Sequence, residues 1–92
     1  MDLTVTDNLF EGRYEALLDG DIVGTAEYEL SDDLMILIHT DVEPTHQDQG
    51  IGGTLARFVV NDARRRGLRV RPVCPFLRSW IDRHPDYADL VG

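Results

Sequence analysis

The sequence predicts an α+β fold: a mostly antiparallel sheet with one strand–helix–strand crossover and a short C-terminal helix. Three observations lead to this prediction. Apolar and polar residues alternate in the first part of the chain, a helical pattern follows, and a short strand and a short helix come last. The 92 residues leave room for one domain, which we expect to span residues 1–92.

Residues 12–30, GRYEALLDGDIVGTAEYEL, predict a hairpin of two strands. Apolar residues alternate on both sides of Asp19-Gly20, a dipeptide that favours the tight turn between paired strands. These two strands are expected to begin the antiparallel part of the sheet.

The remaining elements follow in chain order. Residues 34–42, LMILIHTDV, are nearly continuously apolar, which is typical of a central strand covered on both faces. Residues 51–66 carry an apolar stripe at helical spacing, and Gly67 ends that helix. Residues 68–73 predict the next strand, and residues 75–83 predict the short helix.

Charge is distributed unevenly along the chain, whose net charge is −8. Residues 1–50 carry 13 acidic residues and one arginine, whereas residues 51–92 carry four acidic residues and eight arginines. The balance excludes an overall basic face for nucleic acid. Either the two halves are oppositely charged solvated surfaces, or the second half binds an anion while the first favours a cation.

The chain shows no apolar run long enough for a membrane span. Its first residues, MDLTVTDNLF, lack the basic and apolar regions of a signal peptide, and its single cysteine, Cys74, excludes an internal disulfide. We therefore expect a cytoplasmic protein.

The segment QDQGIGGT, residues 47–54, stands where the predicted helix begins. A Walker loop would need a lysine after the last glycine, and a Rossmann fingerprint would need a glycine at Leu55. A tight turn needs one glycine, and further glycines cost helix stability. The N-terminus of a helix offers unpaired N–H groups, so we expect a phosphate to approach the backbone here.

Residues 42–52, VEPTHQDQGIG, match the pattern V-x-P-x-x-[RQ]-x-x-G-x-[GA]. With the motifs H-T-x-V, P-x-C-x-[FY] and H-P-x-Y in the same order, the chain resembles the GNAT (Gcn5-related N-acetyltransferase) superfamily. It is most similar in pattern to the small single-domain GNAT-like proteins of the YjdJ type. The resemblance covers residues 10–90 and implies a compact GNAT-like fold with acetyl-CoA as acetyl donor and no metal.

By this resemblance, the loop amides and the helix N-terminus hold the pyrophosphate of acetyl-CoA. The end of the central strand lies beside the pantetheine arm, which carries the thioester. The cofactor-binding residues so implied are Thr40, Asp41, Val42, Gln47, Asp48, Gln49, Gly50, Ile51, Gly52, Gly53, Thr54 and Cys74. The 3′-phosphate is expected to meet Arg57, Arg64 or Arg65.

Many members of this superfamily use a carboxylate on the central strand as base and a tyrosine as acid. Here residues 34–38 are all apolar, and Ser79 or Trp80 stands nearest the usual tyrosine. His39 is the candidate base, because imidazole changes charge near neutral pH. The alternative for His39 is a hydrogen bond within the sheet.

Cys74 is the second catalytic candidate. It lies between Val73 and Pro75, where the strand meets the helix, and the resemblance implies that the thioester ends nearby. Three roles stay open for the thiol: it accepts the acetyl group, it protonates the leaving thiolate, or it only fills a small apolar space.

The expected function is acetyl-CoA-dependent transfer of an acetyl group to a primary amine by direct attack. The acidic first half of the chain favours a cationic acceptor. The alternatives are a CoA-binding or regulatory module with little or no catalysis, and an interaction domain. We expect no nucleic-acid or membrane partner, and the sequence leaves the oligomeric state open.

Overall fold

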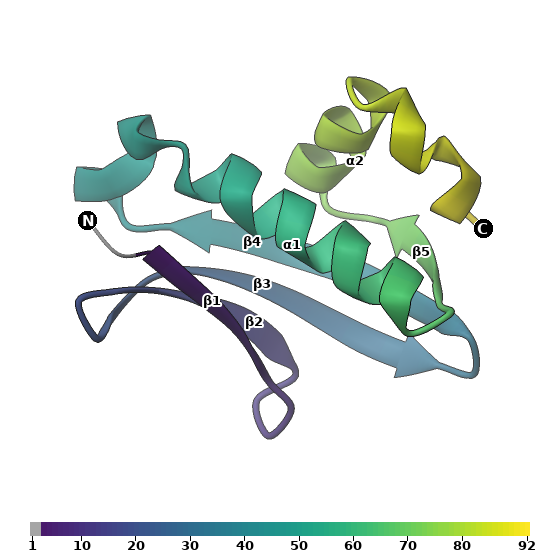
Figure 1. Cartoon of the computed structure of the whole chain (residues 1–92), viewed down its shortest axis with the longest axis horizontal. Helices are drawn as coiled ribbons and strands as arrows, with labels where there is room; N and C mark the ends of the chain where they lie inside the picture. The colour runs from purple at the N-terminus through teal and green to yellow at the C-terminus, as the bar shows by residue number, and fades with distance from the viewer. Residues whose placement is uncertain (1–2) are drawn as a thin grey trace.

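A computed structural model describes residues 3–92 and shows one sheet with helices packed against it (Figure 1). The strands lie in chain order across the sheet. They are β1 (Leu3–Asn8), β2 (Arg13–Leu18), β3 (Asp21–Ser31), β4 (Leu34–Val42) and β5 (Arg69–Pro72). The first four pair antiparallel, and β5 pairs parallel to β4.

Two α-helices and two 3₁₀ helices complete the fold. They are η1 (Pro44–Gln49), α1 (Ile51–Arg65), α2 (Pro75–Asp82) and η2 (Pro85–Leu90). Helix α1 makes the crossover between β4 and β5, so the predicted α+β fold is confirmed. No helix within residues 3–92 is long and apolar enough to cross a membrane.

Strand β1 was not among the predicted elements, which began with the hairpin. It forms because Leu3 and Val5 point inward opposite Leu18 and Ala16 of β2. The alternation of Leu3 and Val5 with the two threonines is a strand signal that the acidic character of the segment obscured. The antiparallel part of the sheet therefore has four strands instead of three.

The turn between β2 and β3 is the predicted one. Asp19 and Gly20 have φ angles of 51° and 89°, and Leu18 pairs with Asp21 across them. Positive φ at both central positions is the geometry that tight hairpins require. A register shift after Ala16 reverses the expected alternation at the start of β3, so Ile22 is exposed.

Strand β4 is central in the sheet but is covered on one face only, so the expectation of two covered faces is wrong. Met35 and Leu37 are fully buried under α1 and α2, whereas Ile38 is 39% exposed. Both α-helices contact the same face (Figure 1), and no described element packs on the other face.

A β-bulge interrupts β4. Glu27 pairs with His39 and Tyr28 pairs with Leu37, so Ile38 is an extra residue with no partner on β3. Beyond the bulge, Thr40 pairs with the buried Ala26 and therefore points inward. The bulge decides which side chains at the end of β4 face the helices.

Helix α1 ends as predicted. Gly67 has a φ of 71°, and its N–H donates to the Arg64 carbonyl at 3.1 Å. The N–H of Leu68 donates to the Ala63 carbonyl at 2.8 Å, which closes the helix end. Phe58, on the edge of the apolar stripe, is 37% exposed, with its ring 5.8 Å from that of Tyr14.

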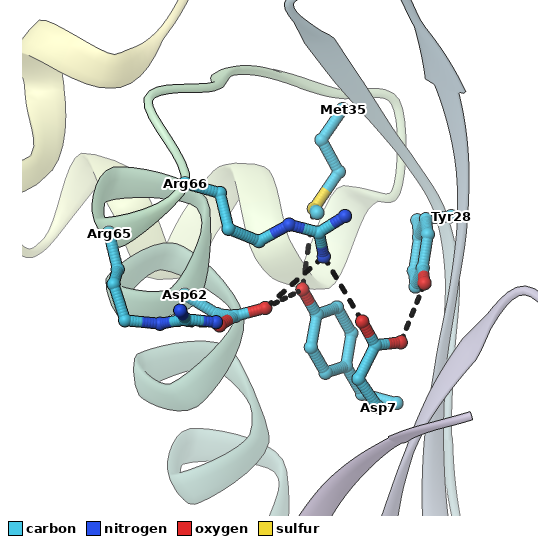
Figure 2. A network of polar contacts seen from close by, with 7 residues as sticks. Asp7, Tyr28, Met35, Asp62, Arg65 and Arg66 are labelled. Carbon is cyan, nitrogen blue, oxygen red and sulfur yellow. Dashed lines mark hydrogen bonds and ion pairs between the residues drawn. The ribbon is translucent and has the colours of Figure 1, made fainter. Parts of the chain in front are cut away.

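A polar network ties β1 to the end of α1 (Figure 2). The Tyr14 hydroxyl donates to Asp62 at 2.7 Å, and the Tyr28 hydroxyl donates to Asp7 at 2.6 Å. Arg66 bridges the two carboxylates, at 3.1 Å from Asp7 and 3.4 Å from Asp62. Segments 59 positions apart in the chain are joined in this way.

The network shifts the pKa values of its members. Burial and the hydrogen bond to Asp62 raise the pKa of Tyr14 far above its ordinary value, and burial and the bond to Asp7 raise the pKa of Tyr28 to about 12. Burial acts to raise the pKa of Asp62, but hydrogen bonds from Tyr14, Arg65 and Arg66 outweigh it and hold that pKa below the ordinary value.

Candidate active site

A cleft opens where β4 and β5 diverge. The two strands pair from Leu34 and Arg69 as far as Leu37 and Pro72. The N–H groups of Val73 and Cys74 then both donate to the Leu37 carbonyl, at 3.1 and 2.9 Å, and the chain turns into α2. Beyond this point residues 38–42 of β4 have no strand beside them on that side.

The cleft has a volume of about 430 Å³. The end of β4, the η1–α1 segment and the first turn of α2 form its walls. The lining residues are Thr40, Asp41, Val42, Gln47, Gly50, Gly52, Gly53 and Phe76. Seven of these eight residues were expected at a cofactor site, and Phe76 was not.

Phe76 lies on the apolar side of α2, yet it is 39% exposed and lines the cleft. Its position directly after Pro75, in the first turn of α2, aims the ring at Gly52 across the cleft wall. No sequence signal separates such a residue from a core phenylalanine, because both fit an apolar helical stripe.

Three glycines stand at the start of α1, and the structure gives a different reason for glycine at each position. Gly50 has a φ of 76°, which a residue with a side chain rarely adopts. A Cβ on Gly52 would lie 2.9 Å from the Phe76 ring, so packing excludes a larger residue. A Cβ on Gly53 would lie 3.8 Å from Trp80, its nearest neighbour, so neither packing nor backbone geometry requires glycine there.

The N-terminal turn of α1 borders the cleft, and its first backbone amides lack a partner within the helix. Gly50 caps the helix, and the first intrahelical bond runs from the Thr54 N–H to the Gly50 carbonyl at 3.1 Å. The N–H groups before Thr54 have no partner within the helix, and no acidic residue lies in the first turn. Such a helix start favours an anion.

Two of the expected cofactor residues do not offer side chains to the cleft. Ile51 is buried in the core, and Gln49 lines a separate small cavity with Leu3 and Leu18. The side chain of Asp48 lies outside the described part of the chain.

A second groove, of about 490 Å³, runs between α1 and α2. Its lining residues are Gly50, Gly53, Thr54, Arg57, Phe58, Asn61 and Trp80. Gly50 and Gly53 line both the groove and the cleft, so the two cavities meet at the helix N-terminus.

The groove distinguishes the three candidate arginines. Arg64 pairs with Asp89 at 2.6 Å, and Arg65 pairs with Asp62. Arg57 lines the groove, lies 5.4 Å from the centre of the Trp80 ring, and takes part in no ion pair found among residues 3–92. Arg57 is therefore the arginine available to a bound anion.

Cys74 lies directly behind the cleft wall. Its side chain is 3% exposed, and its thiol donates to the Thr40 hydroxyl with an Sγ···Oγ1 distance of 3.5 Å. Thr40 itself lines the cleft. The structure therefore brings Cys74 to the expected place, but with Thr40 between the sulfur and the open space.

His39 is not brought to the cleft. It pairs with Glu27 on the uncovered face of the sheet and is exposed, whereas Thr40 points to the helix-covered face. The bulge at Ile38 produces this separation. The two catalytic candidates, His39 and Cys74, lie on opposite faces, which speaks against a joint role.

The C-terminal aromatic residues lock the end of the chain to the core. The His84 ring stacks on Trp80 with centroids 3.7 Å apart, and the Tyr87 hydroxyl donates to Asn61 at 2.8 Å. These contacts hold η2 against α1 and α2. Within residues 3–92 no group of histidine, cysteine or carboxylate side chains is placed to hold a metal ion.

The family described as GCN5-related N-acetyl-transferase matches residues 13–90. The match covers most of the chain, and the chain belongs to this family of acetyltransferases. The resemblance stated from the loop and the three further motifs is thereby confirmed. No curated protein matches the chain in sequence.

Three solved structures illustrate the fold. A GCN5-like protein from Staphylococcus aureus superposes with a TM-score of 0.75 at 22% identity, covering 98% of this chain and 88% of that one. The ribosomal-protein-S18-alanine N-acetyltransferase from Escherichia coli superposes with a TM-score of 0.66 at 18% identity, covering 78% and 50%. A GNAT-family protein from Desulfovibrio desulfuricans gives a TM-score of 0.55 at 31% identity, covering 63% and 39%.

Proposed function

We propose that the protein transfers the acetyl group of acetyl-CoA to a primary amine by direct attack. One observation carries the proposal: two cavities meet at a helix N-terminus whose first amides have no partner within the helix. Acetyl-CoA has this form, because its nucleotide and its pantetheine arm extend from opposite ends of a pyrophosphate.

The pyrophosphate is held at the first turn of α1. The free N–H groups there and the partial positive charge of the helix end favour phosphate oxygens. Gly53 lines both cavities without a packing need for glycine, which leaves the backbone open to close approach. The nucleotide then lies in the groove, where Arg57 meets a phosphate.

The pantetheine arm lies in the cleft along residues 38–42. Backbone groups on that side of β4 have no partner strand, so they are available to the amides of the arm. The thioester reaches toward the point where the strands diverge, near Thr40 and Cys74.

Transfer requires the acceptor as a neutral amine. Its nitrogen forms a bond to the thioester carbonyl carbon and loses a proton, the carbon–sulfur bond breaks, and the CoA thiolate takes up a proton, so that the products are an amide and CoA thiol. Holding both reactants in the cleft supplies much of the acceleration. Thr40 is the hydroxyl nearest the thioester, and Cys74 orients it through the 3.5 Å contact.

A second function, CoA binding without catalysis, is favoured by one observation. His39 lies on the far face, and among the described side chains that line the cleft Asp41 is the one carboxylate. The described lining of the cleft contains no histidine to take a proton from the amine, which favours CoA binding without turnover. Release of free thiol in the presence of amines separates the two functions.

The decisive experiment uses Gly53→Val. Substitution of Gly50 would strain the backbone, and substitution of Gly52 would displace Phe76, whereas a side chain at Gly53 enters the cavities alone. We expect calorimetry to show acetyl-CoA affinity at least about tenfold weaker, a loss of about 1.4 kcal/mol. Ala88→Val, on the exposed surface of η2 outside both cavities, is the control and should bind as wild type does.

Circular dichroism and thermal unfolding must show that both variants are folded. Equal acetyl-CoA binding by Gly53→Val and wild type would show that the ligand does not lie at the helix start.

A further inference from the structure

The sheet face opposite the helices is uncovered by the described chain. Helices α1 and α2 pack on the other face (Figure 1). We name this surface the open sheet face and define it by the outward residues of β3 and β4. They are Thr25, Glu27, Glu29, Ile36, Ile38, His39 and Asp41.

The open sheet face mixes apolar and acidic side chains. Ile38 is 39% exposed, and Ile22 beside this surface is 43% exposed. Glu27, Glu29 and Asp41 are exposed and take part in no ion pair found in the described chain. Uncovered apolar residues rimmed by charge are typical of a surface that meets a partner.

The charge around this face has one sign over a long stretch. Residues 14–56 contain no lysine or arginine. Their acidic residues are Glu15, Asp19, Asp21, Glu27, Glu29, Asp32, Asp33, Asp41, Glu43 and Asp48. Arg13 neutralises Glu15 at 2.8 Å, and the remaining carboxylates leave a negative field over β3 and β4.

The basic residues of this face stand at its two edges. Arg13 of β2 lies across from Glu27 and forms its ion pair with Glu15. Arg69 and Arg71 of β5 pair with Leu34 and Ile36, at the start of β4. Strand β5 ends at Pro72, so the part of the face next to the cleft contains no arginine from β5.

We propose that the open sheet face binds a peptide segment rich in lysine and arginine, which carries the acceptor amine. The inference rests on the proposed function and identifies the substrate class. Charge complementarity selects the partner, because an acidic surface attracts a polycation and orients it. Isoleucine side chains between the carboxylates pack against the aliphatic stems of lysine and arginine.

The shape of the surface favours a peptide over a small free amine. The hollow next to Asp41 on this side has a volume of about 60 Å³ and is lined by residues 22–25, Asp41 and Glu43. A site for a small molecule is a deeper cavity of roughly 300 Å³ or more. A shallow face along two strands fits an extended chain.

The open sheet face is continuous with the cleft. Asp41 lines both the shallow hollow and the cleft, so it stands at the rim between them. The divergence of β4 and β5 leaves the edge of residues 38–42 free at the same place. A peptide on the face can therefore present one amine over this edge to the thioester in the cleft.

The test measures binding of a fluorescein-labelled peptide of arginine, lysine and serine, without acetyl-CoA, to wild type and to the double variant Glu27→Lys with Glu29→Lys. The control is Asp82→Lys with Asp86→Lys, which changes the net charge equally on α2 and η2. We expect the open-face variant to bind at least about tenfold more weakly and the control to change about twofold or less. Higher salt should weaken binding to wild type.

Backbone chemical shifts measured by NMR locate the peptide and should change in β3 and β4. Equal binding by the open-face variant, an equal loss in the control, or shift changes confined to α1 and α2 would each overturn the inference. If the peptide binds as expected but calorimetry detects no acetyl-CoA binding, the proposed function fails instead.

Discussion

Replacing Tyr28 by phenylalanine tests the network that joins β1 to the body of the protein. The Tyr28 side chain is 6% exposed, and its hydroxyl donates to Asp7 at 2.6 Å. A hydrogen bond to a charged group contributes roughly 1.5–3 kcal/mol. Because Arg66 still pairs with Asp7 in the variant, we expect the low end, a loss of about 1.5 kcal/mol in the free energy of unfolding near pH 8.

The pH dependence makes this prediction specific. Burial and the bond to Asp7 raise the pKa of Tyr28 from 10.0 to about 12. A pKa raised in the folded state adds stability below the unfolded pKa, and this stability is lost as pH rises toward the folded pKa. The full loss for Tyr28 is at most about 2.7 kcal/mol, of which about half is reached at pH 11.

Phenylalanine has no proton to lose, so the Tyr28→Phe variant lacks this part of the alkaline destabilisation. The difference in unfolding free energy between wild type and variant should therefore shrink from about 1.5 kcal/mol at pH 8 to near zero at about pH 11. Urea unfolding followed by circular dichroism at both pH values measures it. The double variant with Asp7→Asn gives the coupling energy between the two side chains.

A difference that is the same at pH 8 and pH 11 would refute the assignment of the raised pKa to Tyr28. A coupling energy near zero would show that the hydroxyl and the carboxylate do not interact in solution.

Two further predictions concern the cleft and the groove. Arg57→Ala should weaken acetyl-CoA binding about tenfold in calorimetry and reduce the salt dependence of that binding. The control is Arg64→Ala, which should leave the affinity within about twofold because Arg64 pairs with Asp89 in the wild type. Equal effects of the two substitutions would remove the assignment of Arg57. Cys74→Ala should keep most thiol-releasing turnover and lower the unfolding free energy by about 1–2 kcal/mol. Intact-mass measurement after incubation with acetyl-CoA alone should show no hydroxylamine-labile acetyl group, since the buried thiol lies behind Thr40; such a group forming as fast as turnover would establish a covalent route.

Local sequence determined the elements whose geometry depends on neighbouring residues. Asp19-Gly20 specifies the turn because both positions need positive φ, and Gly67 ends α1 for the same steric reason. The loop at residues 47–54 was located at a helix start because an apolar stripe at helical spacing begins directly after it. The loop and three further local motifs carried the resemblance to the GNAT superfamily, and the family match confirms it.

Only the tertiary structure decided the features that depend on contacts between distant segments. The extra residue Ile38 in β4 becomes visible only in its pairing with β3, and it turns His39 away from the cleft. Arg57 is distinguished from Arg64 because Asp89 lies 25 positions beyond Arg64 and reaches it only in the folded chain. Periodicity assigns a side chain to a face of its own element, but strand register and ion pairing depend on energies summed over both partners. These partner-dependent contacts separate the side chains that line the cleft from those that lie behind it.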